Sequence, residues 1–463
     1  MNAKSKKSDN TSLFSSLASS CSMTTQELTK WSLGFFLVAQ FLFLLFIQFP
    51  TKQSFDEFHY VPSAKQFLEL RENQNWEHPP LAKELMAIGI GLFGDRPIGW
   101  RFMSTLFGSL TLVGMFFWAL ALFRDSKIAI WTTFLTLVNQ LLYVQARIGM
   151  LDTFMVAFLV WGLAAFTFLF SSKFSFSALH RRRISVFMGA CFGFATACKW
   201  FAVVPWVFCI GLLALVLLFD SWGLQFSKNV AGSNEDFHEE MYSPGLFSDF
   251  SFRQLIWAFV AVPVLAYFVT FIPFFFVEHS PPYGFLDILE MQPKMFDGQL
   301  RVVNSHPYMS DWKSWPWMTR PIWYAFDKEL DPQYVRGVIL LGNPILMWGG
   351  LLAMLGTAIS WLKTRSRDSF LILSFYLVFV FCWAVIPRKV AFYYYYYPAG
   401  MILTFAFGHL AQRYEHKISK GQAIRWAIAG SCLGLFIYFF PVLSGIKIQS
   451  ETFRRWMWLQ SWI

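Results

Sequence analysis

Long apolar stretches separated by short polar ones dominate the chain from about residue 31 onward. A helix that crosses a membrane needs about 20 mostly apolar residues. Eleven stretches approach that length, at about 31–49, 99–122, 128–146, 151–170, 184–198, 200–219, 254–276, 337–361, 370–387, 390–411 and 424–444. The first begins too far from the N-terminus and is too long for a cleaved signal peptide. The pattern therefore predicts an all-α polytopic membrane protein with about eleven transmembrane helices.

The distribution of Lys and Arg over the short loops predicts the orientation of these helices. If the N-terminus is cytoplasmic, the basic residues of segments 181–183, 363–367 and 413–425 fall on the inside. Cytoplasmic loops carry an excess of Lys and Arg, so this orientation is the favoured one. The two longest loops, about 50–98 and 277–336, then lie outside.

The same pattern predicts the organisation of the chain. In the first outer loop, residues 60–74 place their apolar side chains along one side, which is typical of a helix lying in the membrane interface. A second interfacial helix is expected to begin near Leu81. We expect four parts: a disordered cytoplasmic tail (1–30), an N-terminal transmembrane module that includes outer loop 50–98 (31–276), an outer loop without an inserted domain (277–336), and a C-terminal module of four transmembrane helices (337–463).

The composition supports a membrane protein. Hydrophobic residues make up 56% of the 463 residues and charged residues only 14%, whereas soluble globular proteins carry about 25% charged residues. This excludes a disordered chain, a disulfide scaffold and an ordinary soluble enzyme. The net charge of +10 is explained by the basic cytoplasmic loops. No nucleic-acid partner is expected, because the sequence has no soluble basic domain to bind one.

Unusual polar residues gather on one side of the predicted membrane. The predicted orientation places on the outer side, in chain order, Asp56, Glu57, His78, Lys83, Arg147, Asp152, Lys199, His306, Arg320 and Arg388. Charges close to membrane depth are costly and point to function. Cations and carboxylates gathered together indicate an anionic substrate and a base.

Adjacent acids at this position suit the transfer of a sugar to a hydroxyl group. Such a transfer needs a base that takes the hydroxyl proton, and Asp56, just after the first span, can serve. Glu57 is expected to orient a partner or to hydrogen-bond sugar hydroxyls. If the donor is a lipid phosphate sugar, its leaving group is an anion, and Arg147 and Lys199 are suited to stabilise that charge.

At these residues the sequence resembles a known family, the dolichyl-phosphate-mannose protein O-mannosyltransferases of the GT-C fold. The resemblance covers roughly residues 30–463. The similar segments run in order as SFDEFHYVPSA, EHPPLAKELMAIG, ARIGMLDTFM, GACFGFATACKW, SHPYMSDWKSWPWMTRPIWYAFD, RGVILLGNPILMWGG and PRKVAFYYYYYPA. Only about 25 residues separate Glu278 from Ser305, so the MIR domain of eukaryotic members is absent. The chain therefore looks like a compact prokaryotic-type member.

The resemblance implies a glycosyltransferase with a GT-C catalytic module. Its donor would be polyprenyl-phosphate-mannose and its acceptor Ser or Thr of proteins, with inversion at the sugar. Carried over by motif, Asp56 and Glu57 are catalytic. The expected donor-phosphate residues are Arg147, Lys199, Asp152, Lys83 and His78, and the residues expected to face donor or acceptor are His306, Tyr308 and Arg320.

The resemblance also implies surroundings for the enzyme. It is expected in the plasma (inner) membrane, among membrane lipids, with its active face extracytoplasmic. No cofactor is required and the expected site contains no metal, although the sequence leaves a divalent ion open. A dimer is also left open.

Two other functions fit parts of the pattern. One is a GT-C transferase that moves another lipid-linked sugar to a lipid or glycan acceptor. The other is a transporter of anionic solutes, which predicts charges at the bilayer midplane and repeated halves with broken helices. The Tyr run 393–397 is expected in an aromatic belt at the membrane interface, with stacking on a sugar or a polyprenyl chain as the alternative.

Overall fold

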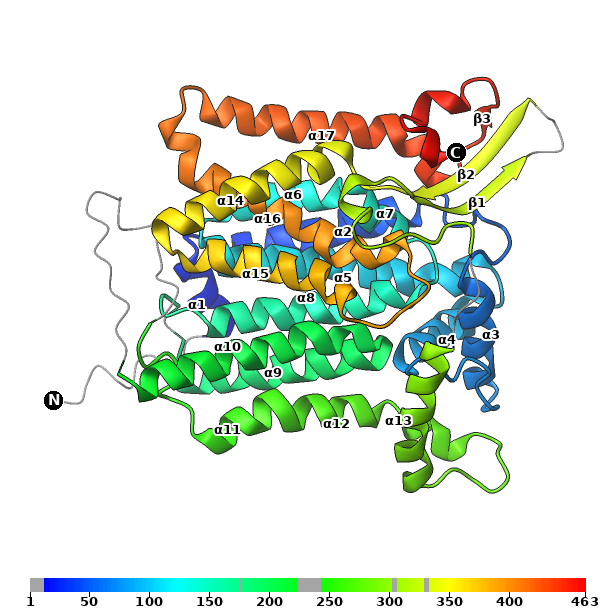
Figure 1. Cartoon of the computed structure of the whole chain (residues 1–463), viewed down its shortest axis with the longest axis horizontal. Helices are drawn as coiled ribbons and strands as arrows, with labels where there is room; N and C mark the ends of the chain where they lie inside the picture. Colours follow the sequence, from blue (N-terminus) through cyan, green and yellow to red (C-terminus); the bar gives the residue numbers. More distant parts are fainter. Residues whose placement is uncertain (1–11, 175, 224–242, 302–305, 329–332) are drawn as a thin grey trace.

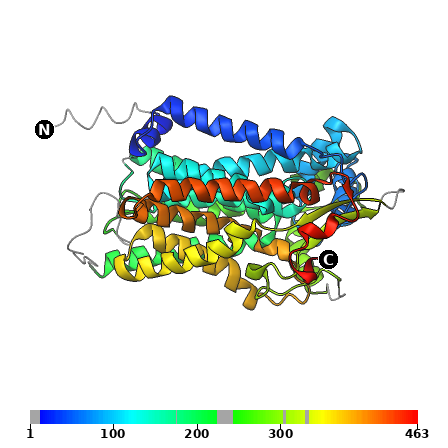
Figure 2. The same cartoon turned by 90° about the horizontal axis from the view of Figure 1, so that it is seen from above.

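The structure is a computed structural model that describes residues 12–463 except 175, 224–242, 302–305 and 329–332. Long helices run side by side in a bundle, and the chain begins at one end of it (Figures 1 and 2). Helices α3 (Glu57–Leu68), α4 (Leu81–Phe93) and α13 (Phe285–Leu300) and a small β-sheet lie at the opposite end, which we call the site end. Apolar side chains fill the space between the helices.

The first half of the bundle is built around α5. Its long, apolar sequence is buried on nearly all sides, and Gly108 and Gly114 let it pack closely, since an added Cβ would collide with Ala146 and Val160. The helices before residue 280 are α1 (Leu13–Ser20), α2 (Thr25–Leu44), α3 (Glu57–Leu68), α4 (Leu81–Phe93), α5 (Pro97–Phe123), α6 (Ser126–Leu137), α7 (Gln140–Gln145), α8 (Leu151–Leu169), α9 (Ala178–Cys198), α10 (Val203–Ser221), α11 (Phe252–Ile256) and α12 (Val262–Val269).

The second half adds an outer helix, a sheet and four long helices. The elements are α13 (Phe285–Leu300), β1 (Ile322–Lys328), β2 (Tyr334–Leu340), α14 (Gly350–Thr364), α15 (Arg367–Phe381), α16 (Tyr397–Tyr414), α17 (Gly421–Ser444) and β3 (Ile448–Gln449). The strands are antiparallel in the order β1-β2-β3. Helices α14, α15 and α16 pack on one another, and α16 also packs on α6, which joins the two halves.

The predicted helical membrane fold is confirmed, with differences in detail. Among the described residues, eight helical segments are long and apolar enough to cross a membrane. The other three predicted stretches are also helical: 128–146 corresponds to α6 and α7, 184–198 to α9, and 390–411 to α16. These helices lie within the same bundle (Figure 1). The expected interfacial helices of the first outer loop are α3 and α4.

Two expectations were wrong. Residues 12–30, predicted as part of a disordered tail, form α1 and the start of α2; Leu17 of α1 is buried against the bundle, while residues 1–11 lie outside the described part. The stretch 337–361, predicted as one helix, begins as strand β2 and becomes helical only at Ile345. Short apolar runs fit a buried strand as well as a helix, so their periodicity could not separate the two.

A buried polar cluster connects α14, α15 and α16. His409 Nδ1 lies 2.6 Å from Asp368 Oδ2, and its Nε2 lies 2.9 Å from Ser360 Oγ. Although the order Ser–His–Asp is that of a hydrolytic triad, the Ser360 side chain is completely buried. The cluster is therefore a hydrogen-bonded connection between three helices, since buried polar groups must be paired.

Candidate functional site

The polar residues of the site end meet in a recess between α3, the junction of α9 and α10, and residues 383–397. Phe55, which precedes Asp56, the N-cap residue of α3, has a φ of +53°, a region that bulky residues rarely occupy. Its ring is held edge-on by Tyr324, Phe392 and Tyr394. This contact fixes the direction in which the next residue, Asp56, points.

Asp56 lies inside the recess with one carboxylate oxygen engaged. The hydroxyls of Tyr60 and Tyr394 donate to its Oδ2 at 3.2 and 3.3 Å. Within the described residues, no hydrogen bond reaches Oδ1. Burial raises the pKa of Asp56, while the Lys199 ammonium partly offsets this effect. The carboxylate is therefore a base with a free oxygen and an increased proton affinity.

Glu57 points away from the recess and is completely buried. The Arg101 guanidinium donates through Nε to Oε1 and through Nη2 to Oε2, both at 2.7 Å. The backbone N–H groups of Gly149 and Ser54 donate to the same carboxylate, at 2.7 and 3.0 Å. The geometry thus corrects the expectation that Glu57 is catalytic or binds a sugar. It is a positioning residue that fastens the start of α3 to α5.

Lys199 and Asp152 form a second buried ion pair, beside Asp56. The Lys199 Nζ lies 2.8 and 2.7 Å from the two Asp152 oxygens, and it lies over the rings of Tyr394 and Tyr395, 4.9 and 4.7 Å from their centroids. Lys199 is the C-cap residue that follows α9, and Asp152 is in the first turn of α8. An ammonium group has three N–H donors, so one donor is left for a further acceptor.

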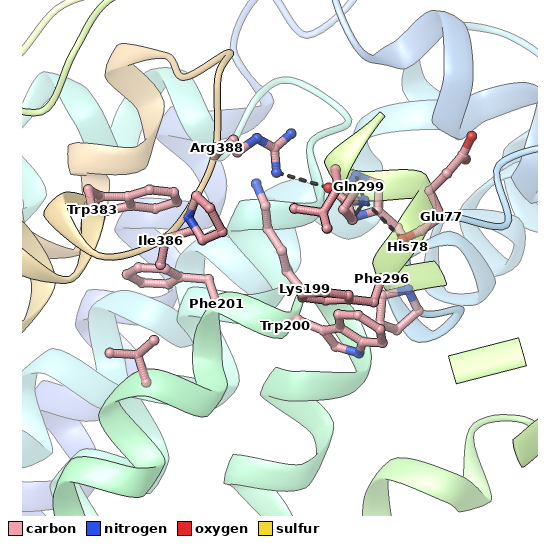
Figure 3. A pocket seen from close by; sticks show the side chains of 14 residues that line it. Glu77, His78, Lys199, Trp200, Phe201, Phe296, Gln299, Trp383, Ile386 and Arg388 are labelled. Atoms are coloured by element: carbon pink, nitrogen blue, oxygen red, sulfur yellow. Dashed lines mark hydrogen bonds between the residues drawn. The ribbon is translucent and has the colours of Figure 1, made fainter. Parts of the chain in front are cut away.

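An apolar slot opens next to Lys199 (Figure 3). Its cavity of about 240 Å³ has an aromatic lining formed by Trp200, Phe201, Phe296 and Trp383. At its polar end, the side chains of Lys199, His78 and Arg388 approach one another. A slot with apolar walls and a cationic end is suited to a ligand that carries an anion on a long apolar chain.

Arg388 is a site residue to which the sequence analysis gave no role. Its Nη1 donates to Gln299 Oε1 at 2.9 Å and its Nε to the Val390 carbonyl at 3.0 Å. The Gln299 amide of α13 faces the His78 ring, at 3.2 Å from Nε2. One signal was present in the sequence: Arg388 is a cation in a short loop on the side predicted to be poor in basic residues.

His78 joins the site, as expected, and it is neutral there. Its ring lies edge-on to Tyr60, with the ring centroids 5.9 Å apart. Burial holds the pKa of His78 well below its usual range, and the cations Lys199, Lys83 and Arg388 lower it further. A neutral imidazole can donate or accept a hydrogen bond in the slot, but it adds no charge.

Two expected phosphate ligands point elsewhere. Arg147 is 1% exposed, and its Nη1 and Nη2 donate to the carbonyls of Leu443 and Ser444 at the end of α17, at 3.1 and 3.3 Å. Lys83 is also buried, and it donates to the carbonyls of His78, at 2.8 Å, and Asn75. Both side chains are occupied in joining backbone segments, which corrects their expected contact with a donor phosphate.

The second outer loop reaches the site through one of its three expected residues. The His306 ring packs edge-on against Phe55, at 5.2 Å between ring centroids. Tyr308 is partly exposed, and its backbone N–H donates to His306 Nδ1 at 3.1 Å. Arg320 is exposed and donates to the Pro307 carbonyl, so it supports the loop from outside.

The Tyr run was wrongly expected in an aromatic belt. All five side chains from Tyr393 to Tyr397 are buried, at 0–2% exposure. Tyr394 touches Asp56 and Lys199, and the ring of Tyr395 stacks on Trp383 at 4.4 Å. Tyr394 and Tyr395 therefore form one wall of the recess.

The donor set of the site leaves little for a metal ion. Among the described residues, no group of three or more His, Cys, Asp and Glu side chains is arranged to hold one. Asp152 and Glu57 are each paired with a cation.

Comparison with known proteins assigns a family to most of the chain. Residues 95–277 match the family model described as dolichyl-phosphate-mannose-protein mannosyltransferase. Residues 285–462 match the model of the C-terminal four-transmembrane region of protein O-mannosyltransferase. Curated relatives include the polyprenol-phosphate-mannose–protein mannosyltransferases of Corynebacterium glutamicum, 25% identical over 88% of each chain, and of Mycobacterium tuberculosis, 24% identical over 88% of this chain and 86% of that one.

Solved structures share the fold. A chain of the Saccharomyces cerevisiae protein O-mannosyltransferase Pmt1-Pmt2 complex, bound to the sugar donor, is similar with a TM-score of 0.77 and 16% identity, over 96% of this chain and 94% of that chain. ArnT from Cupriavidus metallidurans, bound to undecaprenyl phosphate, has a TM-score of 0.54 at 16% identity, over 87% of this chain and 64% of that chain.

The buried Glu57–Arg101 pair predicts that substituting Glu57 destabilises the protein far more than substituting an exposed glutamate. Glu57→Gln leaves Arg101 buried without its counter-charge, so we expect the free energy of unfolding to fall by about 3–5 kcal/mol. Thermal unfolding of the purified protein in detergent measures this as a lower melting temperature.

Glu69→Gln is the matched control. Glu69 makes an exposed pair with Arg71 at 3.2 Å, and exposed pairs contribute only about 0–1 kcal/mol. Equal melting temperatures for the two variants would show that Glu57 does not anchor α3.

Proposed function

Because this chain belongs to the protein O-mannosyltransferase family, we propose that it transfers mannose from a polyprenyl-phosphate-mannose donor to Ser and Thr hydroxyls of proteins. One observation carries the proposal: Asp56, with one free oxygen, is linked through Tyr394 to Lys199, which together with Arg388 lines the polar end of an apolar slot. A base and an anion site are the two elements that this transfer requires.

The donor lipid occupies the slot in this proposal. The polyprenyl chain lies against the aromatic walls formed by Trp200, Phe201 and Trp383, where burial of apolar surface stabilises it. The phosphate lies between Lys199 and Arg388, and the remaining ammonium donor and the guanidinium bind its oxygens. Because Asp152 already pairs with Lys199, this pair adds no net charge, and Arg388 supplies the positive charge that faces the anion.

The chemical step follows from this placement. The acceptor oxygen attacks the anomeric carbon on the face opposite the phosphate, so a β-linked donor gives an α-linked product. The bond between the anomeric carbon and the phosphate oxygen breaks as the new carbon–oxygen bond forms. Asp56 takes the hydroxyl proton through its free Oδ1. Polyprenyl phosphate leaves as an anion, and Lys199 and Arg388 stabilise its charge.

In this proposal the site end faces the extracytoplasmic side of the membrane. The start of α9, which carries the exposed Arg182 and Arg183, and the end of α14, which is followed by the exposed Arg365, lie at the opposite end of the bundle (Figure 1), as the bias of Lys and Arg toward cytoplasmic loops requires. In the plasma membrane of a prokaryote, this orientation exposes the recess to proteins that have crossed the membrane.

Asp56→Asn is expected to lower kcat by about 10²–10⁴-fold, because the amide cannot accept the proton. In the wild type, the pKa of Asp56 is raised by burial, so kcat/KM should fall with decreasing pH from above the ordinary carboxyl pKa of about 4. A radiolabelled donor and a Thr-containing peptide measure both effects. A variant that stays folded in the membrane and keeps near-normal activity would contradict the assignment of the base.

The anion site predicts different effects for two arginines. Arg388→Gln should weaken donor use, with kcat/KM for the donor about 10²-fold lower. Arg147→Gln is the matched control, because that guanidinium is bound to α17 carbonyls and should affect stability rather than donor dependence. Donor titrations on both variants test this. A loss of donor use confined to Arg147→Gln would place the phosphate elsewhere.

Orientation is tested by labelling of introduced cysteines. His59 and Arg182 are both exposed; His59 belongs to α3, at the site end, and Arg182 to the start of α9, at the opposite end of the bundle (Figure 1). In a Cys382→Ser background, which removes the partly exposed native thiol, a membrane-impermeant maleimide added to intact cells should label His59→Cys but not Arg182→Cys. Permeabilised cells should show labelling of both. The opposite pattern in intact cells would place the site in the cytoplasm.

A further inference from the structure

Strand β1 has a free edge at the site end. It pairs through residues 322–328 with β2 only, and the sheet order is β1-β2-β3. In the part of the chain that the structure describes, the backbone of β1 makes no hydrogen bond on its other side. The outer part of this edge, Ala325–Asp327, lies at the surface, and an exposed free edge presents N–H and C=O groups to which another extended chain can pair.

This edge begins next to the proposed base. The Tyr324 ring of β1 lies 5.5 Å from the ring of Phe55, the residue before Asp56. Burial raises the pKa of Tyr324 well above its usual range, and the Asp152 and Asp56 carboxylates raise it further. The pairing register skips from Trp323 to Ala325, so Tyr324 forms a β-bulge. Bulges are frequent next to active sites, where they redirect a side chain.

The strand then leads from the site into solvent. Its first three residues, Ile322–Tyr324, are buried, Ala325 is partly exposed, and Phe326 and Asp327 are exposed. Figure 1 shows the sheet projecting from the site end, with β1 on the side nearer α3. A chain lying along β1 would therefore have one part beside Asp56 and the rest outside.

We propose that the acceptor polypeptide binds as an added strand along the free edge of β1. This inference rests on the proposed function, which it deepens by naming how the protein acceptor is held. Paired strands lie about 4.8 Å apart, so a strand added along the accessible residues Ala325–Asp327 continues at its inner end toward Phe55 and Asp56. Since alternate side chains point to the same face, one Ser or Thr hydroxyl can face the base while its neighbours point away.

This mode of binding determines which acceptors are used. Main-chain hydrogen bonds supply the affinity, and a side chain of the acceptor is recognised only in the pocket at the reacting position. A Ser or Thr in an extended segment of almost any sequence can then accept the sugar, whereas a Ser or Thr within a stable helix cannot. Proline at a position whose N–H faces β1 removes a hydrogen bond.

The test is a backbone scan of an acceptor peptide with a single Thr. Each residue is N-methylated in turn, which removes one N–H without changing any side chain. Pairing with β1 predicts an alternating result: methylation raises the peptide KM about tenfold or more at every second residue and has little effect at the residues between. The insensitive positions serve as internal controls. Equal effects at all positions, or none, would overturn the pairing.

The unmodified peptide separates this inference from the proposed function. If the unmodified peptide accepts no mannose, the proposed function fails. If it accepts mannose but the scan shows no alternation, only the pairing with β1 fails. A second measurement needs no catalysis: Asp327→Cys should form a disulfide with single-cysteine peptides at alternating positions, and cross-linking without alternation, or its absence, contradicts the proposal.

Discussion

The buried ion pair between Glu57 and Arg101 determines where the rest of the site lies. Its two hydrogen bonds connect the start of α3 to α5, and Arg101 Nη1 also donates to the carbonyls of Ile47 and Pro50. Glu57 in turn accepts from Gly149, just before α8. Three parts of the chain therefore meet at one carboxylate. Asp56 precedes Glu57 directly, so its position follows from this pair.

A second constraint is the cost of charge at membrane depth. Charges there require partners, and the chain provides them within the protein: Lys199 pairs with Asp152 and lies over two tyrosine rings. The recess can therefore hold a cation ready for an anionic leaving group without a large local excess of charge. Its aromatic walls, from Trp200 to the buried Tyr run, lower the exposure of these groups to water and so strengthen their electrostatic interactions.

Much of the architecture could be predicted from the sequence, because long apolar stretches and loop charges are both constrained by the bilayer. The convergence of Asp56, His78, Asp152 and Lys199 was also predictable, since all four follow or precede spans on the same side. The hydrogen-bond partner of each side chain could not be predicted. Arg147 lies in one of the segments that resemble the family, but it binds carbonyls of α17, almost 300 residues away in the sequence. A local sequence pattern contains no information about such a contact. The sheet was missed for a related reason, because β2 is an apolar run adjoining a helix.

In the proposed reaction, Asp56 faces the acceptor while Lys199 and Arg388 hold the departing phosphate. A structure of the enzyme with a non-hydrolysable donor analogue and a Thr peptide tests this most directly. The account predicts the phosphate within hydrogen-bond distance of Lys199 and Arg388, the lipid against Trp200 and Trp383, and the Thr hydroxyl at Asp56 Oδ1. A phosphate bound away from Lys199 and Arg388, or an acceptor hydroxyl out of reach of Asp56, would contradict it.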